Sequence, residues 1–182
     1  MAKKIQGVFD IPIRYIFLAL IALPNLYIFY FIFTPLTVYP IYFMLSLFFE
    51  ASLIGNIVLV NNETAIHLIE ACIAGSAYYL LLILNLSTAG IKLKKRVGMI
   101  LLSFASLLII NLIRIFLLSL LFISGSLWFD FTHKLFWYSL SVIFVIAIWF
   151  AEVRIFKIKN IPVYSDIKFL YKNTSLKMRM RK

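Results

Sequence analysis

The segment from Val97 to Ile123 reads VGMILLSFASLLIINLIRIFLLSLLFI and is the longest apolar run of the chain. A helix that crosses the hydrocarbon core of a bilayer, about 30 Å thick, needs roughly 20 apolar residues. The basic run Lys92, Lys94, Lys95 and Arg96 comes directly before this segment. Basic residues that flank an apolar run are typical of a membrane-spanning helix with its basic end in the cytoplasm.

The composition of the whole chain agrees with this interpretation. Of its 182 residues, 64% are hydrophobic and 14% are charged, and the mean hydropathy is +1.02. A soluble domain is typically about 45–50% apolar and about 25% charged. With 6 Gly, 5 Pro and a single Cys, the chain is neither collagen-like, disordered nor a disulfide-stapled secreted domain. The length suits one domain.

Four further apolar segments are long enough to be spans, namely Ile13–Phe33, Leu36–Ile54, Cys72–Ala89 and His133–Phe156. The sequence therefore predicts an all-α transmembrane bundle of five, or six, hydrophobic segments, with a kink at Pro24. β-Branched residues on both sides of Asn61-Asn62 predict a short extracytoplasmic hairpin or interfacial loop within Gly55–Ile69. We expect a single transmembrane domain over residues 1–156, with a catalytic core at about 50–156, and a basic juxtamembrane tail over residues 157–182.

The net charge of +11 comes from 18 basic and 7 acidic residues, and the basic residues are unevenly distributed along the chain. The bases gather near the N-terminus, at Lys92–Arg96 and after Arg154, where they flank apolar segments instead of lining a face. This placement favours membrane anchoring over binding of nucleic acid. It predicts a multi-pass protein of the cell membrane with its C-terminal tail in the cytoplasm. Five spans put the N-terminus outside, whereas Lys3, Lys4 and Arg14 favour the inside. Either the other basic residues determine the orientation in spite of these three, or Leu36–Ile54 is re-entrant.

Three chemically capable residues fall at one predicted depth. An ionisable side chain within a span costs roughly 2.5–3.5 kcal/mol near the helix centre, so such residues are informative. Counted at about 1.5 Å per helical residue from the nearest cytoplasmic bases, Cys72, Arg114 and His133 lie about 30, 27 and 31 Å away from them. Three separate helices thus bring a thiol, a guanidinium and an imidazole to the outer face.

These side chains form a plausible catalytic set. A thiol attacks a carbonyl as the thiolate, which a nearby imidazole or cation favours. His133 would take the proton of Cys72 and return it to a leaving amine, while Arg114 would stabilise the thiolate or an oxyanion. Each residue also has a purely structural interpretation: a cysteine is often apolar filler, an arginine can extend to the membrane surface, and a histidine that opens a helix can lie at the interface.

Three neighbouring residues would support this site. Gly75 and Ser76, one turn below Cys72, would let another helix or a substrate helix approach closely. Asn111 precedes Arg114 by one turn on the same face and would orient its guanidinium. Two histidines, one cysteine and no carboxylate pair within a span do not make a zinc or di-iron site, and there is no Gly-rich phosphate loop. We therefore expect neither metal nor cofactor.

The same residues resemble the motifs of a known family. Glu70-Ala71-Cys72-Ile73-Ala74-Gly75 resembles the Ala-Cys-small-Gly motif of exosortases and archaeosortases, and Asn111-Leu112-Ile113-Arg114 resembles their Asn-x-x-Arg. His133 opens the following apolar segment, where the family has its histidine. The order of Cys72, Arg114 and His133 fits the family, as do their separations of 42 and 19 residues.

The resemblance implies a membrane-embedded cysteine transpeptidase. Such enzymes recognise exported proteins that end in a short motif, a transmembrane helix and a basic cluster, cleave near the motif, and pass the new C-terminus to a lipid. Carried over, Cys72 would form the thioacyl intermediate, Arg114 would stabilise charge and His133 would move the proton. Two other functions remain open from the sequence: a substrate-binding subunit of a vitamin-type membrane importer, and a purely structural interaction protein.

Overall fold

The computed structural model describes residues 2–22, 25–88, 90–136 and 141–158, together with residues 162, 164, 167 and 171, and it describes side chains from Ile11 onward. The expected kink at Pro24 and nearly all of the tail after residue 158 lie outside the described residues. Helices and three short strands make up the described chain. In order they are α1 (Ala2–Ala22), α2 (Tyr27–Ser46), β1 (Ala51–Ile54), β2 (Ile57–Val60), β3 (Thr64–His67), α3 (Glu70–Ile73), α4 (Gly75–Leu86), α5 (Leu93–Ile123), α6 (Phe129–Leu135) and α7 (Ser141–Ile155).

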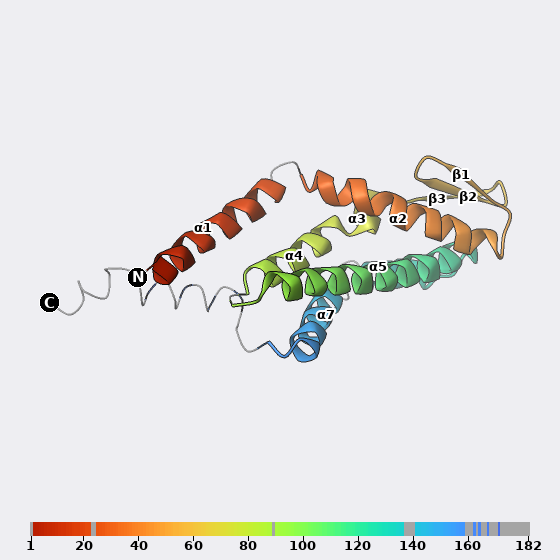
Figure 1. Cartoon of the computed structure of the whole chain (residues 1–182). Coiled ribbons are helices and arrows are strands. Elements are labelled where there is room, and N and C mark those ends of the chain that lie inside the picture. Colours follow the sequence, from red (N-terminus) through yellow and green to blue (C-terminus); the bar gives the residue numbers. More distant parts are fainter. Residues whose placement is uncertain are drawn as a thin grey trace.

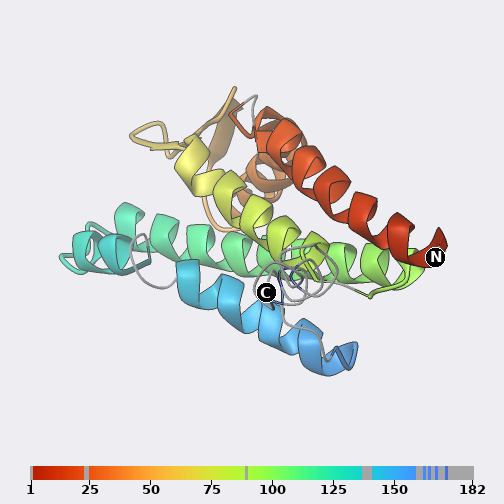
Figure 2. The ribbon, with the colours of Figure 1, turned by 90° about the vertical axis from the view of Figure 1, so that its left-hand side faces the viewer.

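The helices run back and forth along one long axis (Figure 1). α1 and α2 follow one another toward the sheet, and α3 and α4 return beneath α2. α5, the longest helix with 31 residues, then runs the length of the molecule, and α7 packs against it on the side away from α2 (Figures 1 and 2). The sheet therefore lies at one end of the molecule, beside the end of α2 and the C-terminal half of α5.

The three strands form an antiparallel sheet in the order β1-β2-β3. Val58 pairs with Leu53 on one side and with Ile66 on the other. The chain turns between β2 and β3 at Asn61 and Asn62, whose φ angles of 52° and 55° are in the left-handed region that asparagine tolerates better than most residues. The hairpin expected at this position thus supplies two of the three strands of the sheet.

Two apolar clusters hold the helices together. The first is aromatic, since the rings of Phe33 and Tyr78 stack with centroids 3.6 Å apart and Phe104 meets both edge-on. The second joins α2 and α5 to the inner face of the sheet. Its buried members are Val38, Ile41, Leu45, Val58, Val60, Leu68 and Ile115. The sheet is therefore fixed to the helices by buried side chains of β2 and by Leu68, which directly follows β3.

The prediction of an all-α bundle with five or six spans is wrong. The structure contains a three-stranded sheet, and two of the described helices, Tyr27–Ser46 and Leu93–Ile123, are long and apolar enough to cross a membrane. Length and composition alone support this last statement. The fourth predicted segment, Val97–Ile123, corresponds to α5, which begins four residues earlier.

The first two predicted segments divide at a different place. Asn25 and Leu26 have φ angles of 48° and 59°, a conformation that cannot continue a right-handed helix, so one helix ends before them and α2 begins after them. α2 then continues through Pro35 and Pro40. Each proline removes one helical hydrogen bond, but the buried side chains of α2 hold the helix in place. The end of the second segment, Ala51–Ile54, is strand β1.

The third predicted segment is also interrupted. Ala74, with φ of 61°, separates α3 from α4. The fifth predicted segment, His133–Phe156, covers the end of α6 and all of α7, and residues 137–140 lie outside the described residues. An apolar composition indicates burial or lipid contact, but it does not indicate such a local break in the backbone, so the third run is predicted as one helix where the structure has two.

The described helices carry large apolar side chains on their outer faces. Leu101, Ile109 and Ile113 of α5 are at least half exposed, as are Phe31, Tyr39 and Phe43 of α2. Extended exposed apolar surfaces mark contact with a membrane or a partner. Together with the two helices of spanning length, these faces are consistent with a protein that associates with a membrane.

Candidate functional site

Cys72, Arg114 and His133 line the same cavity, which has a volume of about 230 Å³. Each comes from a different element: α3, α5 and α6. Strand β3 and the residues that follow it form one wall, and Ile115, Leu118 and Phe122 of α5 form another. The cavity is mostly apolar. Its polar side chains are those of Cys72, Arg114 and His133, which the sequence singled out, together with His67 and Ser119.

The break between α3 and α4 shapes the environment of Cys72. In a continuous helix the Cys72 carbonyl oxygen would accept the backbone N–H four residues later. The left-handed turn at Ala74 interrupts that pattern, and the side-chain amide of Asn111 donates to the Cys72 carbonyl oxygen at 2.8 Å instead. Asn111 is buried, with 3% of its surface exposed. It therefore fixes the backbone that carries the thiol, a contact that the sequence did not suggest.

Arg114 is held by residues that the sequence analysis did not select. Its Nη1 donates to Ser141 Oγ at 3.0 Å, and Ser141 Oγ donates to the Phe136 carbonyl oxygen at 2.7 Å. Its Nε is buried and finds no hydrogen-bond partner among the described residues. The guanidinium therefore keeps unused donor capacity next to the cavity.

His133 comes from α6, the third element that contributes one of these side chains to the cavity. Its imidazole ring stacks on the ring of Phe129, with centroids 5.4 Å apart and an interplanar angle of 9°. Both residues belong to α6 and both line the cavity. The stacking fixes the plane of the imidazole, which is the group that a thiol in this cavity would need as proton acceptor.

The two other supporting residues do not line this cavity. A Cβ atom at Gly75 would lie 2.7 Å from a ring carbon of Tyr30, so the absence of a side chain there admits Tyr30 of α2. The close approach expected at Gly75 is thus made by a residue of the chain itself. Ser76 is exposed and takes no part in the cavity.

Cys72 lies in α3, outside both helices of spanning length, and its environment acts on the thiol in two directions. Burial raises the pKa of Cys72 above its ordinary value of 9.0, whereas a backbone hydrogen bond from Ile69 and the positive charge of Arg114 lower it. Burial is the larger effect, so the resting side chain is a neutral thiol that needs a proton acceptor to react.

The described residues contain no group of three or more His, Cys, Asp or Glu side chains that could hold a metal ion. What this cavity offers is a thiol, an imidazole and a guanidinium within apolar walls. These groups suit attack on a carbonyl by sulfur, transfer of one proton and stabilisation of one negative charge.

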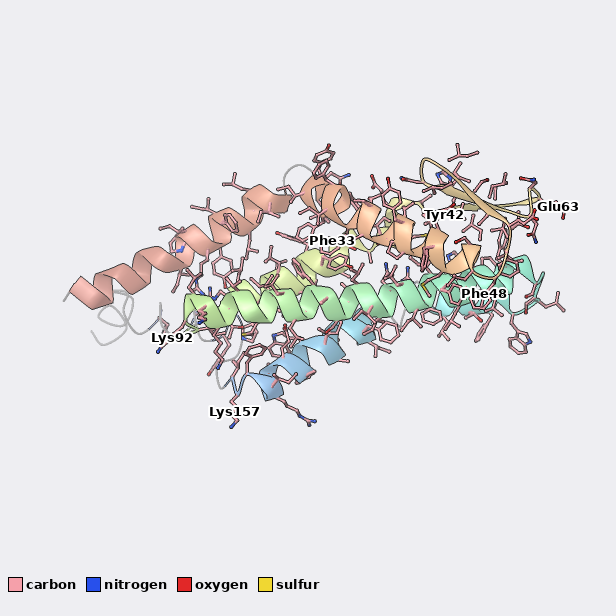
Figure 3. The ribbon with its side chains drawn as sticks, turned by 45° about the vertical axis from the view of Figure 1, so that its right-hand side comes forward. Phe33, Tyr42, Phe48, Glu63, Lys92 and Lys157 are labelled. Atoms are coloured by element: carbon pink, nitrogen blue, oxygen red, sulfur yellow. The ribbon has the colours of Figure 1, made fainter. Side chains whose placement is uncertain are left out.

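The basic residues meet at the other end of the molecule. Arg14 Nη1 donates to the Leu86 carbonyl oxygen at 2.9 Å, and Arg96 Nη2 donates to the Thr88 carbonyl oxygen at 2.8 Å. Lys95 Nζ donates to the Phe156 carbonyl oxygen. Figure 3 shows Lys92 and Lys157 at this end and Glu63 at the opposite end. Because β3 and the second half of α5 form its walls, the cavity lies toward the end that carries Glu63.

Two features of this arrangement escaped the sequence analysis. Ser141 supports Arg114, and the sequence signal was available, since it is one of few hydroxyl residues in an apolar segment. Glu152 is buried, with 1% of its surface exposed, and its Oε2 accepts a hydrogen bond from Asn85 at 3.1 Å. It lies two residues before Arg154, next to the charges that flank the apolar segment, and the sequence analysis therefore did not select it.

Comparison with known proteins finds no family model that matches the chain, and no similar curated protein or solved structure.

Proposed function

We propose that this chain is a membrane cysteine transpeptidase of the archaeosortase and exosortase type. It cleaves a C-terminal sorting signal of exported proteins and transfers the new C-terminus to a lipid. One observation carries the proposal: Cys72, Arg114 and His133 come from three elements and line one cavity. The motif order of the sequence supports the choice of family.

The proposed reaction has two halves, formation of a thioester on Cys72 and transfer of its acyl group to the acceptor, and all three side chains take part in both. His133 takes the proton of the Cys72 thiol, and the sulfur attacks the carbonyl carbon of the scissile peptide bond. The C–N bond breaks, the leaving amine receives the proton from His133, and the acyl group remains on sulfur as a thioester. His133 then takes the proton of a hydroxyl or amine of the acceptor lipid, whose oxygen or nitrogen attacks the thioester carbon. The C–S bond breaks and the sulfur receives the proton from His133, which restores the thiol. Arg114 stabilises the thiolate and the oxyanion through its charge.

In this proposal the protein passes the cell membrane several times, with α2 and α5 as its full-length spans. The end that carries Arg14, Arg96 and Lys157 faces the cytoplasm, in accordance with the preference of basic residues for that side. The cavity then faces the extracytoplasmic side, where exported substrates arrive. The apolar outer faces of the helices contact lipid.

The test is co-expression with an exported reporter protein that ends in a short motif, a transmembrane helix and a basic cluster. Wild-type protein should shorten the reporter, and Cys72→Ala, Arg114→Gln and His133→Ala should abolish the shortening. Ser76→Ala is the matched control, because Ser76 is exposed and lies outside the cavity; it should retain full processing. Unchanged processing by Cys72→Ala or Arg114→Gln would show that the proposal is wrong.

A substrate-binding subunit of a small-molecule importer is the second candidate, and the apolar walls of the cavity are the observation that favours it. Its volume of about 230 Å³ is below the roughly 300–1,000 Å³ of typical small-molecule sites, which makes the peptidase the better choice. A small ligand that remains bound through purification, equally in wild type and Cys72→Ser, would favour the importer.

A further inference from the structure

The open edge of the sheet lies beside the proposed catalytic cysteine. In the order β1-β2-β3, β3 is an edge strand. The register pairs Val58 with Ile66 and Val60 with Thr64, and the Leu68 N–H donates to the Asn56 carbonyl oxygen at 3.0 Å. In an antiparallel pair, alternate residues bond to the partner strand, so Thr64, Ile66 and Leu68 face β2.

The backbone groups of the intervening residues point the other way. Ala65 and His67 therefore direct their N–H and C=O groups toward the open edge, and both residues are exposed. Unpaired backbone groups on an edge strand are a template for another extended chain. The same two residues line the cavity that holds Cys72, Arg114 and His133.

We infer that an extended segment of the substrate polypeptide binds as a fourth strand along β3, with main-chain hydrogen bonds to Ala65 and His67. This inference rests on the proposed function and states how its substrate is held. An extended peptide is the occupant because its alternating donors and acceptors match those of a strand edge, which a lipid or a small apolar ligand does not provide.

The added strand positions a peptide bond for the thiol. Residues 65–69 line the cavity in succession, and the chain passes from there directly into α3, which carries Cys72. A strand paired with β3 thus runs along the mouth of the cavity. Its side chains point alternately to either face, so one of them enters the apolar space beside Leu118 and Phe122. The site therefore selects an apolar side chain at one position of the peptide and binds the other positions through main-chain hydrogen bonds.

Proline substitution can remove an outward N–H group without disturbing the hydrogen bonds within the sheet. Ala65→Pro removes a donor that faces away from β2, a position where an edge strand tolerates proline. Ala51→Pro is the matched control. Asn61 N–H donates to the Glu50 carbonyl oxygen at 2.7 Å, so by the same alternation the Ala51 N–H faces away from β2 on the other edge strand, β1. Both variants should show the circular dichroism of the wild type.

The probe is a mixture of heptapeptides with randomised apolar side chains, and the readout is the rate at which a maleimide alkylates Cys72 in the full-length protein in detergent. Bound peptide should slow alkylation about tenfold in wild type and Ala51→Pro, and the protection should disappear in Ala65→Pro. The same mixture N-methylated at every amide should not protect the wild type, which tests the inference even if Ala65→Pro fails to fold.

Equal protection by the two mixtures, or no protection by either, would overturn the inference. Neither outcome affects the proposed function, because that function is tested separately by the loss of reporter processing in Cys72→Ala. Conversely, peptide protection with unchanged reporter processing in Cys72→Ala would retain the strand-binding site and reject the transpeptidase.

Discussion

At the scale of single residues, the thiol of Cys72 sets the pH dependence of the site. Its pKa is raised by burial, and the charge of Arg114 opposes that rise. Only the thiolate reacts with an alkylating agent. We therefore expect the rate of alkylation by iodoacetamide to rise about tenfold per pH unit below the pKa and to keep rising beyond pH 9, the ordinary value of the group.

Arg114→Gln removes the opposing charge, so the pKa should rise further and alkylation at pH 8 should become slower than in the wild type. Ser76→Ala should have the wild-type rate. Mass spectrometry of the modified protein measures each rate. A plateau below pH 7.5 would mean that the thiol is already activated in the resting protein, which contradicts the dominant effect of burial.

Glu152 is a second residue whose protonation state matters. Its Oε1 and the Oδ1 of Asn85 are buried and have no hydrogen-bond partner among the described residues. A buried carboxylate without a cation is costly, so we expect the neutral acid. Glu152→Gln should then unfold near the wild-type temperature, whereas Glu152→Ala, which removes one of three acceptors of the Asn85 amide and leaves space in the core, should lose about 1–3 kcal/mol of stability.

Thermal unfolding in detergent measures both variants, with Glu63→Gln on the exposed hairpin as the neutral control. Equal destabilisation by Glu152→Gln and Glu152→Ala would mean that the side chain is ionised and needs its charge. Such an outcome would also imply a compensating cation near Asn85.

Residue-level prediction from the sequence succeeded where it depended on a regular helix. Counting along α5 from Arg96 to Arg114 is valid because α5 is continuous over that distance, and the three selected residues do share a cavity. The hydrogen bond from Asn111 to the Cys72 carbonyl oxygen was not predicted, because helical spacing relates Asn111 to Arg114 but contains no information on the carbonyl that the break at Ala74 leaves open. Ser141 was missed because its partner lies on another helix.

At the scale of elements, the break between α3 and α4 is the feature that hydropathy cannot detect. Ala74 adopts φ of 61°, which costs an L-residue with a Cβ atom roughly 1–2 kcal/mol. Ala74→Gly should therefore stabilise the protein by about 0.5–1 kcal/mol. Ala77→Gly, one turn later within α4, should destabilise it by a similar amount, because glycine is unfavourable inside a helix.

The two variants carry the same substitution three residues apart, so a difference in sign in thermal unfolding isolates the backbone conformation at Ala74. A loss of stability in both would mean that the helix continues through residue 74.

Hydropathy also fails to predict β1 and the course of α2. A mostly apolar run of four residues does not distinguish a strand from the end of a helix. Pro35 and Pro40 lie within a helix that the buried side chains of α2 support.

At the scale of the whole molecule, the distribution of charge fits the structure better than it fits five spans. Five spans would place the two ends of the described chain on opposite sides. In the structure Arg14 donates to Leu86, and the Nη1 of Arg96 reaches the same carbonyl oxygen at 3.4 Å. The basic residues near the N-terminus and those before α5 therefore share one end, and neither of the two explanations for the conflict is needed.

This arrangement predicts the sidedness of three positions. Cys72 is the single cysteine of the chain, so Cys72→Ser provides a cysteine-free background for Lys4→Cys, Glu63→Cys and Lys94→Cys. A membrane-impermeant maleimide applied to intact cells should label Glu63→Cys, which lies at the end with the cavity, and should label the two others only after permeabilisation. Labelling of Lys4→Cys together with Glu63→Cys would separate the N-terminus from the basic end, and would restore an odd number of crossings between Lys4 and Lys94.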